Sequence, residues 1–256
     1  MMRLVHLIRN AGVIFTLMLG VAAAEDLVIG TEGAYPPFNN LTADGQIVGF
    51  DVDIAKALCE RMKVECSVVA IDWEGLIPAL QGDKIDVIAA SLTITEERRK
   101  QVLFTRKYYA TPLAIVARKE AGVAGVEPSA LTGKTLGVQG QTWQADYAAR
   151  TFGKAGAELK LYPGQTDAML DLSGGRLDAV LSDKLQLIDW MRTDGSDCCV
   201  MVGDVPGTGA EAGLAVRLDD RDLHVRLHAA LNAILADGTY DAIRKRYFDI
   251  DIYGEK

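Results

Sequence analysis

The sequence predicts an α/β protein built as two similar lobes, each an open sheet flanked by helices. Short apolar strands alternate with helical segments along almost the whole chain, which is the pattern of open α/β sheets. Residues 80–91 also align without gaps on residues 172–183, and both stretches read as a helix end, a glycine turn, a basic residue and a buried strand. Such joints look alike in many α/β proteins, but two similar lobes is the simpler interpretation.

Composition narrows the class of protein. The 256 residues are 49% hydrophobic and 24% charged, which is typical of globular proteins with one or two domains and excludes disorder, collagen and coiled coil. The net charge is -8 at pH 7 and becomes about -10 once the leader with Arg3 and Arg9 is removed. An acidic body argues against nucleic acid as a partner and mildly favours cationic ligands.

Residues 1–24 are interpreted as a secretory signal peptide. Two arginines precede an apolar run over 11–21, and Ala22, Ala23 and Ala24 offer a small-residue cleavage site before Glu25. The run is shorter than the roughly 20 residues that a bilayer span needs, so we expect cleavage rather than anchoring. We therefore expect export to the periplasm.

The first part of the mature chain is predicted to begin lobe 1. Its strands are short runs rich in β-branched residues between turn signals, and its helix is marked by apolar residues at helical spacing. A second, short helix is expected after Thr95, which is a suitable N-cap residue. The expected strands are Leu27–Thr31, Cys66–Ala70 and Ile85–Ala90, and the helix from Asp51 includes Ile54, Leu58 and Met62.

The rest of the chain is predicted to form lobe 2 and then return to lobe 1. We expect one crossing near Pro112 to Arg118 and the return near Pro206 to Gly213, with Asp237–Gly238 separating the last two helices. The expected strands are Leu113–Arg118, Thr135–Val138, Leu159–Tyr162, Leu177–Ser182 and Ala212–Val216, and the expected helices are Thr142–Phe152, Thr166–Leu172, Lys184–Arg192, Arg221–Ala236 and Thr239–Phe248.

The cysteines and histidines are assigned structural rather than catalytic roles. Cys59 and Cys66 stand seven apart where the chain reverses between a helix and a strand, so we expect a disulfide between them. Adjacent cysteines bridge only with a strained peptide, so the state of Cys198 and Cys199 stays open. His224 and His228 lie four apart on a predicted helix, but nothing nearby completes a metal site.

Three motifs identify a family. They are Val28–Phe38 (VIGTEGAYPPF), Gly49–Ile54 (GFDVDI) and Ser91–Arg98 (SLTITEER). Together they resemble the polar amino acid-binding proteins of ABC importers, particularly the lysine/arginine/ornithine and histidine type, and the likeness covers essentially the whole mature chain. It implies the two-lobed periplasmic binding protein fold of type II with a two-crossing hinge. Lobe 1 would then comprise residues 25–112 and 210–256, and lobe 2 residues 113–209.

The resemblance also implies how the protein works. A small amino acid is the expected ligand and an ABC permease in the inner membrane the expected protein partner, and we expect a monomer without a metal or cofactor. Open α/β sheets bind ligands beyond the carboxyl ends of their strands. Ser91 and Asp183 hold equivalent positions in the two aligned stretches, so we expect them to face one another across a cleft between the lobes.

A free amino acid presents a carboxylate and an ammonium, which need a guanidinium and a carboxylate as partners. Arg98 lies in the first turn after Thr95, close to Thr93, so cation, hydroxyl and helix N-terminal amides share one patch. The resemblance implies that Arg98 binds the ligand carboxylate, with Ser91 and Thr93 as neighbouring contacts. Arg99 and Lys100 are expected to be solvated.

Two residues of lobe 2 complete the expected head-group site. Asp183 ends a buried strand, so its carboxylate either meets a cation or caps the following helix. The resemblance implies that it binds the ligand ammonium. Thr142 opens another predicted helix and resembles the residue whose backbone N–H meets the ligand carboxylate.

Specificity is expected to depend on Glu32, Tyr35 and Trp73. An acidic side chain with two aromatic neighbours suits a cationic side chain, which points to arginine, lysine or ornithine. The alternative is that the aromatic residues belong to the core and Glu32 is solvated. Ala90, Gln141 and Trp143 depart from the residues that related proteins often have there, so a bulkier arginine conjugate such as an opine remains an alternative.

A binding protein without turnover, closing about its hinge, is the leading functional hypothesis. The rival is an enzyme on the same fold, similar to periplasmic cyclohexadienyl dehydratases, with Glu32 as general acid. The sequence offers no second acid–base group for that reaction, and the fold alone does not decide between them. A third possibility is a role in chemotaxis or signalling, in which the ligand-bound closed form binds a receptor. That role would use the same ligand pocket.

Overall fold

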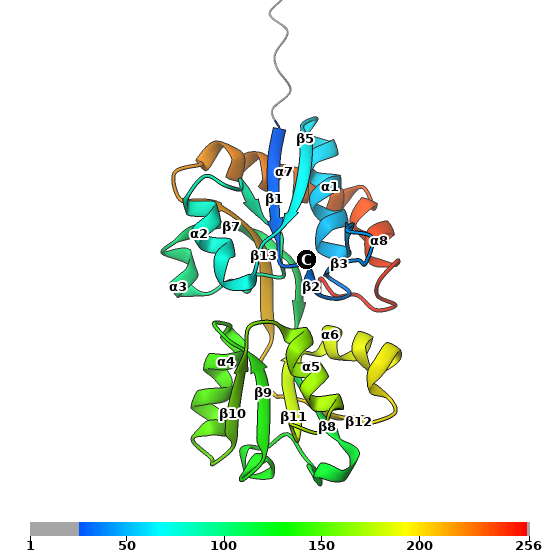
Figure 1. Ribbon diagram of the computed structural model, residues 1–256. Coiled ribbons are helices and arrows are strands. Elements are labelled where there is room, and N and C mark those ends of the chain that lie inside the picture. Colours follow the sequence, from blue (N-terminus) through cyan, green and yellow to red (C-terminus); the bar gives the residue numbers. More distant parts are fainter. Residues whose placement is uncertain (1–25, 255–256) are drawn as a thin grey trace, which may run out of the picture.

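The computed structural model describes residues 26–254 as two α/β bodies, one above the other in Figure 1. The predicted signal peptide lies outside these residues. The upper body is built on a five-stranded sheet in the order β5-β1-β6-β13-β7. Its strands are β1 (Asp26–Thr31), β5 (Glu65–Ala70), β6 (Val87–Ile88), β7 (Val102–Thr111) and β13 (Ala210–Arg217).

The lower body repeats this arrangement with a five-stranded sheet in the order β10-β9-β11-β8-β12. Three strands run parallel at one side of each sheet, and the other two are antiparallel to their neighbours. The two aligned stretches of sequence lead into β6 and β11, which are the central strands. The strands are β8 (Leu113–Arg118), β9 (Thr135–Gln139), β10 (Glu158–Tyr162), β11 (Ala179–Asp183) and β12 (Cys199–Asp204).

Helices cover both faces of the upper sheet. On one face α1 (Phe50–Met62), α7 (Arg221–Ala236) and α8 (Thr239–Arg244) bury a common apolar core. On the other face α2 (Leu76–Gln81) packs over β6 and β13. Because both faces are buried, the strands read as nearly continuous apolar runs. The short helix α3 (Glu96–Arg99) lies beside β7.

The lower sheet is covered in the same way. One face packs against α4 (Trp143–Ala148), and the other against α5 (Gln165–Ser173) and α6 (Lys184–Trp190). The first and last of these helices each continue into a turn of π-helix, over Ala149–Gly153 and Met191–Gly195. Each body thus has a core of its own on both faces of its sheet.

The Gly-Phe-Asp motif has a steric reason. Gly49 precedes α1 with φ 131°, a conformation that L residues rarely adopt. A Cβ at this position would lie 2.3 Å from the carbonyl oxygen of Phe38. The small sheet of β2 (Ala34–Tyr35), β3 (Asn39–Leu41) and β4 (Ile47–Val48) is thereby held against the start of α1.

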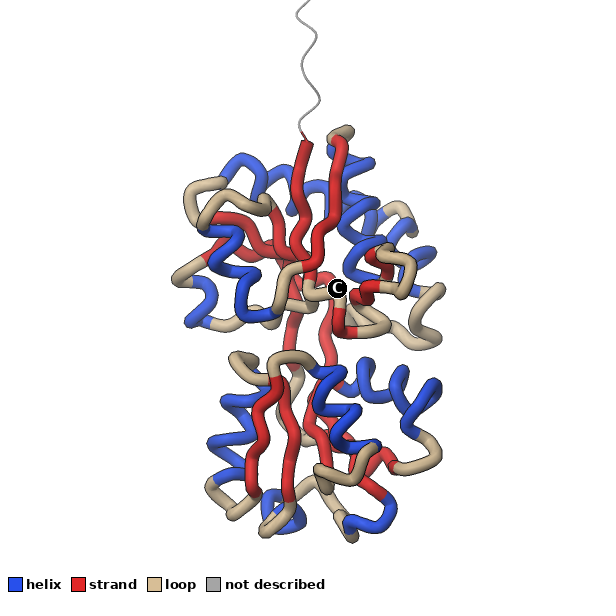
Figure 2. The backbone as a smooth tube through the Cα atoms, viewed as in Figure 1, coloured by secondary structure: helices blue, strands red, loops and turns tan. Residues whose placement is uncertain are grey.

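The chain crosses between the bodies twice. It passes from β7 to β8 through Pro112, and from β12 to β13 through residues 205–209, so that two strand segments run between the bodies in Figure 2. The hydroxyl of buried Thr208 accepts from the backbone N–H of Leu113 at 3.0 Å and donates to the carbonyl of Val205. The upper sheet consists of β1, β5, β6, β7 and β13, and the lower sheet of β8 to β12, which is consistent with the predicted lobe boundaries at residues 112/113 and 209/210. The boundaries themselves stay a prediction.

Several predicted elements differ in extent. The strand expected over Ile85–Ala90 is only the two-residue β6, although the backbone N–H groups of Asp86 and Ala89 on either side of it also donate to carbonyls of β1. The Asp86 carboxylate accepts from the N–H of Val28 and from Arg217. The last helix ends at Arg244 rather than at Phe248. The strands β7 and β12 and the small three-stranded sheet were not predicted.

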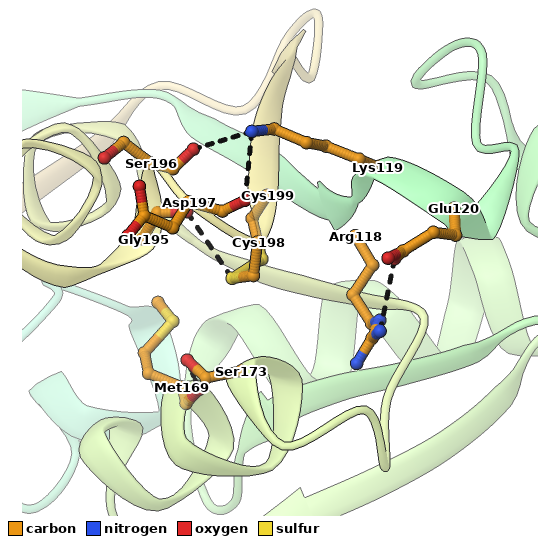
Figure 3. Close-up of a disulfide and its surroundings, with 10 residues drawn as sticks. All are labelled: Arg118, Lys119, Glu120, Met169, Ser173, Gly195, Ser196, Asp197, Cys198 and Cys199. Atoms are coloured by element: carbon orange, nitrogen blue, oxygen red, sulfur yellow. Dashed lines mark hydrogen bonds and ion pairs between the residues drawn. A yellow bond between two sulfur atoms is a disulfide. The ribbon is translucent and has the colours of Figure 1, made fainter.

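Both pairs of cysteines form disulfides. The predicted bridge Cys59–Cys66 joins the end of α1 to β5, with the Cα atoms 6.2 Å apart. The neighbours Cys198 and Cys199 are also bonded to each other (Figure 3). Lys119 fastens this turn, because its backbone N–H donates to the carbonyl of Cys198 and its Nζ to the carbonyls of Ser196 and Asp197.

Residues 26–254 contain no helix long and apolar enough to cross a membrane. They also contain no group of three or more His, Cys, Asp and Glu side chains placed to hold a metal ion. The Nε2 atom of His224 is hydrogen-bonded to the carbonyl oxygen of Phe104 at 2.8 Å.

Candidate ligand-binding site

A small cavity lies where the two bodies meet, at the ends of β1, β6, β9 and β11. It is lined by seven of the eight residues expected to bind the ligand, and Arg98 lies just outside it, against Trp73. The lining residues are Glu32, Tyr35, Trp73, Ala90, Ser91 and Thr93 from the upper body, and Gln139, Thr142, Gln144 and Asp183 from the lower body.

Arg98 is a cation in a desolvated position. Its Nη1 donates to the carbonyl of Thr93 at 3.0 Å, and its Nη2 donates across to the carbonyl of Gln141 at 3.3 Å. The Thr95 hydroxyl caps α3 by accepting from the Arg98 N–H, as predicted. Burial lowers the pKa of Arg98 to about 10. The guanidinium has no carboxylate within ion-pair distance among the described residues.

Asp183 is the matching buried anion in the lower body. One carboxylate oxygen accepts from the Tyr35 hydroxyl at 2.8 Å, and the other from Nε2 of Gln144 at 3.3 Å. Asp183 is the N-cap residue of α6, as the alternative expected, but its side chain makes no capping hydrogen bond. Burial raises the pKa of Asp183 to about 6. No cation of residues 26–254 lies within ion-pair distance of it.

Glu32 is a second carboxylate of the same cavity, and it is half-buried. Its Oε1 accepts from Nε2 of Gln139 at 2.6 Å across the cleft. Burial is the main cause that raises the pKa of Glu32 to about 7, opposed by the hydrogen bond from Gln139 and helped by the neighbouring carboxylates of Asp72 and Asp167. Glu32 is therefore not a solvated surface residue.

The hydroxyl groups of the site are already committed as donors. Ser91, held at φ 53°, donates from Oγ to the buried carboxylate of Asp51 at 2.9 Å. Thr142 donates to the carbonyl of Gln139 and accepts from the N–H of Ala145, which caps α4. Ser91 Oγ therefore offers lone pairs to a cation, and Thr142 offers its backbone N–H rather than its side chain.

Sequence reasoning did not single out Gln139, Gln144 and Asp51. Gln139 ends β9 and Gln144 lies in the first turn of α4, so both belong to the strand-end positions where α/β sheets bind ligands. Their positions at a strand end and at a helix start are the sequence feature from which both residues could have been predicted. Asp51 belongs to the Gly-Phe-Asp motif and was not predicted to be part of the site. Its carboxylate accepts hydrogen bonds from Tyr108, Asn39 and Ser91, and so it holds Ser91 in place beneath the cavity.

This arrangement suits a small molecule that carries both charges. The cleft brings together the half-buried guanidinium of Arg98, the half-buried carboxylate of Glu32 and the buried carboxylate of Asp183, and none of the three has an ion-pair partner among residues 26–254. Desolvated charges are costly unless they are paired, so a ligand that supplies the missing partners gains from each of them. The chemistry offered is binding of a carboxylate and of one or two cationic groups.

Comparison with known proteins agrees with this fold. Residues 27–250 match the model of the bacterial extracellular solute-binding proteins, family 3. The L-arginine-binding protein of Pseudomonas aeruginosa is 44% identical over 239 residues, covering 91% of this chain and 92% of its own. The lysine/arginine/ornithine-binding periplasmic protein of Escherichia coli is 38% identical over 240 residues, with 91% and 92% covered.

Solved structures give the same result. An ancestral arginine-binding protein bound to arginine superimposes with a TM-score of 0.82 at 35% identity, covering 87% of this chain and 98% of that one. Family match, sequence relatives and structural similarity all extend over both bodies. The chain belongs to the bacterial extracellular solute-binding proteins, family 3.

Proposed function

We propose that this protein is the substrate-binding component of an ABC importer and captures a cationic L-amino acid of the arginine, lysine and ornithine class. The observation that carries the proposal is the pair of unneutralised charges, Arg98 in the upper body and Asp183 in the lower. An α-amino acid places a carboxylate and an ammonium on one carbon. A single head group therefore supplies the counter-charge to both lobes.

Capture works by hinge closure. Arg98 and Ser91 belong to the upper lobe and Asp183 and Thr142 to the lower, so the full set of contacts exists only when the lobes meet on the ligand. The ligand then stabilises the closed state by its differential affinity for it. Export to the periplasm, action as a monomer and recognition of the closed form by a membrane permease complete the proposal.

Glu32 supports a cationic side chain. The carboxylate lies beyond the head-group residues, with Tyr35 and Trp73 lining the same cavity. A guanidinium or ammonium group next to Glu32 would give the carboxylate the favourable interaction that it loses when burial removes water from it. Ion pairing with Glu32 and cation–π contact with Trp73 are both stronger in such a desolvated site.

A second candidate is a lyase acting on cyclohexadienyl acids. It is favoured by one observation, the half-buried Glu32 with a pKa of about 7, because a substantial fraction of this carboxyl group is then protonated at neutral pH, as a general acid requires. Arg98 would then bind a substrate carboxylate. Asp183 counts against this reaction, because a buried anion repels an anionic substrate that has no ammonium group.

The test is a thermal-shift screen of the mature, ligand-stripped protein, followed by calorimetry on every hit. The panel contains the common amino acids, octopine and nopaline as opines, and prephenate, with turnover of prephenate followed separately. Arginine, lysine or ornithine should raise the melting temperature in proportion to ln(1 + [L]/Kd). A shift for an opine alone changes the cargo, and turnover of prephenate replaces the proposal by the lyase.

A further inference from the structure

The cleft holds a contact between the lobes that uses no charged group of the lower lobe. The indole Nε1 of Trp73 donates to the backbone carbonyl of Gln141 at 3.2 Å, and Arg98 Nη2 donates to the same oxygen at 3.3 Å. A carbonyl oxygen has two lone pairs, so it can accept both hydrogens. The guanidinium also lies over the Trp73 ring, with Cζ 5.2 Å from the centroid.

We propose that Trp73 is a positioning residue whose indole N–H, with Arg98 and the Gln141 carbonyl, latches the lobes together and orients the Arg98 guanidinium for the ligand carboxylate. The hydrogen bond of the latch raises the affinity for every ligand by the same factor, because it does not involve the ligand side chain. The cation–π contact proposed above between Trp73 and a cationic side chain adds to it for cationic ligands alone. This inference rests on the proposed function for the choice of ligands, and it can also be tested without any ligand.

The acceptor is held in place by its surroundings. Gln141 has φ 52°, a left-handed conformation that non-glycine residues adopt only where neighbouring structure fixes it. On one side the Gly140 N–H donates to the carbonyl of Tyr162 at 2.8 Å, and on the other Thr142 caps α4. The Gln141 carbonyl therefore points at the upper lobe without any contribution from its own exposed side chain.

The latch is compatible with a bound ligand. A guanidinium has five N–H donors in a fixed plane, and the two contacts to the Thr93 and Gln141 carbonyls use only two of them. Three donors remain for a carboxylate. The stack on Trp73 fixes the plane of the guanidinium, so these donors have a defined direction before the ligand arrives.

The test compares Trp73→Phe with wild type by stopped-flow binding of arginine and of a neutral amino acid that binds measurably. Phenylalanine keeps an aromatic face for Arg98 and removes the N–H. We expect the dissociation rate of the neutral ligand to rise about three- to tenfold, the size of one net hydrogen bond, and that of arginine to rise at least as much, with the association rate within twofold. Trp73→Leu, which also removes the stack, should give a larger increase.

Trp190→Phe is the matched control, because it makes the same substitution at the end of α6, away from the cleft, and should leave both rates unchanged. An unchanged dissociation rate in Trp73→Phe overturns the latch. So does a loss confined to arginine, since it would show that Trp73 acts through the ligand side chain.

If no amino acid binds the wild-type protein, the proposed function fails and the latch is tested without ligand. Spin labels on exposed positions of the two lobes, such as Val225 and Leu170, then report the distance between the lobes. A longer distance in Trp73→Phe upholds the latch, and an identical distribution in the two proteins overturns it.

Discussion

Arg98 and Asp183 are the two side chains on which the proposed function depends most. Asp183 is buried and Arg98 half-buried in the cleft, each has its pKa moved towards the neutral form by desolvation, and neither has an ion-pair partner among residues 26–254. Such groups lower the stability of the closed form when it is alone. Their retention in the cleft is explained by a ligand that carries both opposite charges.

Replacing either charge should abolish capture. We expect Arg98→Ala and Asp183→Asn each to weaken binding of every amino acid by about 2 to 5 kcal/mol, because the ligand group left behind is buried without a partner. Calorimetry gives the measurement. Arg99→Ala is the matched control, since Arg99 is exposed and paired only with Glu96 on its own helix. Full affinity in either cleft variant would remove that residue from the site.

Glu32 should make the affinity for cationic ligands depend on pH. Its pKa is raised to about 7 by burial, so below pH 7 an arginine side chain must displace a proton before it can pair with the carboxylate. The dissociation constant for arginine is expected to rise as the pH falls, approaching about tenfold per pH unit well below pH 7. Asp183, with a pKa of about 6, becomes protonated as the pH falls below about 6 and then weakens the binding of all amino acids, in addition to the effect of Glu32.

Glu32→Gln separates the two carboxylates. The amide still accepts a hydrogen bond from Gln139 but carries no charge. We expect arginine to bind this variant more weakly and to lose the pH dependence around 7, while a neutral amino acid keeps its wild-type affinity. Equal losses for arginine and a neutral ligand would instead mark Glu32 as structural.

Much of the candidate site could be anticipated from the sequence, because its residues follow strands or begin helices. Asp183 ends a strand, and Thr95 and Thr142 are helix caps with a local signature. Gln139 and Gln144 could not be found in this way, since glutamine carries no charge signal. Their roles arise from partners more than 30 positions away.

At the scale of elements, the sequence predicted apolar strands well and interrupted ones poorly. The strand Leu113–Arg118 has the predicted bounds, because it is a continuous apolar run buried on both faces. The longest strand, β7, was missed because Arg106 and Lys107 break its pattern. Its pairing with β13 places those cations at the surface, which only the tertiary structure determines.

The two disulfides should differ in what they contribute to stability. Cys59–Cys66 ties α1 to β5, and removing it frees a loop that the bridge closes in the unfolded chain. We expect Cys59→Ala/Cys66→Ala to lower the free energy of unfolding by about 2 kcal/mol and the melting temperature by about 4 to 8 °C. Calorimetric melting measures this, and arginine affinity should stay within about twofold, by the additivity of distant sites.

Cys198→Ala/Cys199→Ala is the control for that variant. It removes the same bond, but the residues are adjacent, so the bridge closes no loop of appreciable length. Its melting temperature should fall by less. An equal or larger fall would show that the adjacent disulfide, rather than Lys119 and its carbonyl contacts, holds the start of β12.

At the scale of the whole molecule, two bodies with separate cores are joined by two short segments. Each sheet buries its helices mainly within its own body, so the lobes can move against one another while most of each core stays buried. Leu185 at the start of α6 is an apolar contact between the bodies, because it packs with the core of the upper body. Hydrogen bonds also join the bodies, among them those from Tyr35 to Asp183 and from Gln139 to Glu32, and a ligand bound between the lobes can add to these contacts and set hinge closure. The hinge itself must hold the two crossings side by side.

Thr208 is the residue that joins the two crossings. It is 1% exposed, and its hydroxyl accepts from the Leu113 N–H of one crossing and donates to the Val205 carbonyl of the other. Thr208→Val keeps the shape but leaves both backbone groups buried without partners. We expect a loss of about 1 to 3 kcal/mol in the free energy of unfolding, measured by urea denaturation. Thr208→Ser restores the hydroxyl and should recover most of that stability, because the hydrogen bonds and not the methyl group join the crossings. If serine and valine destabilise equally, packing of the methyl group holds the hinge instead.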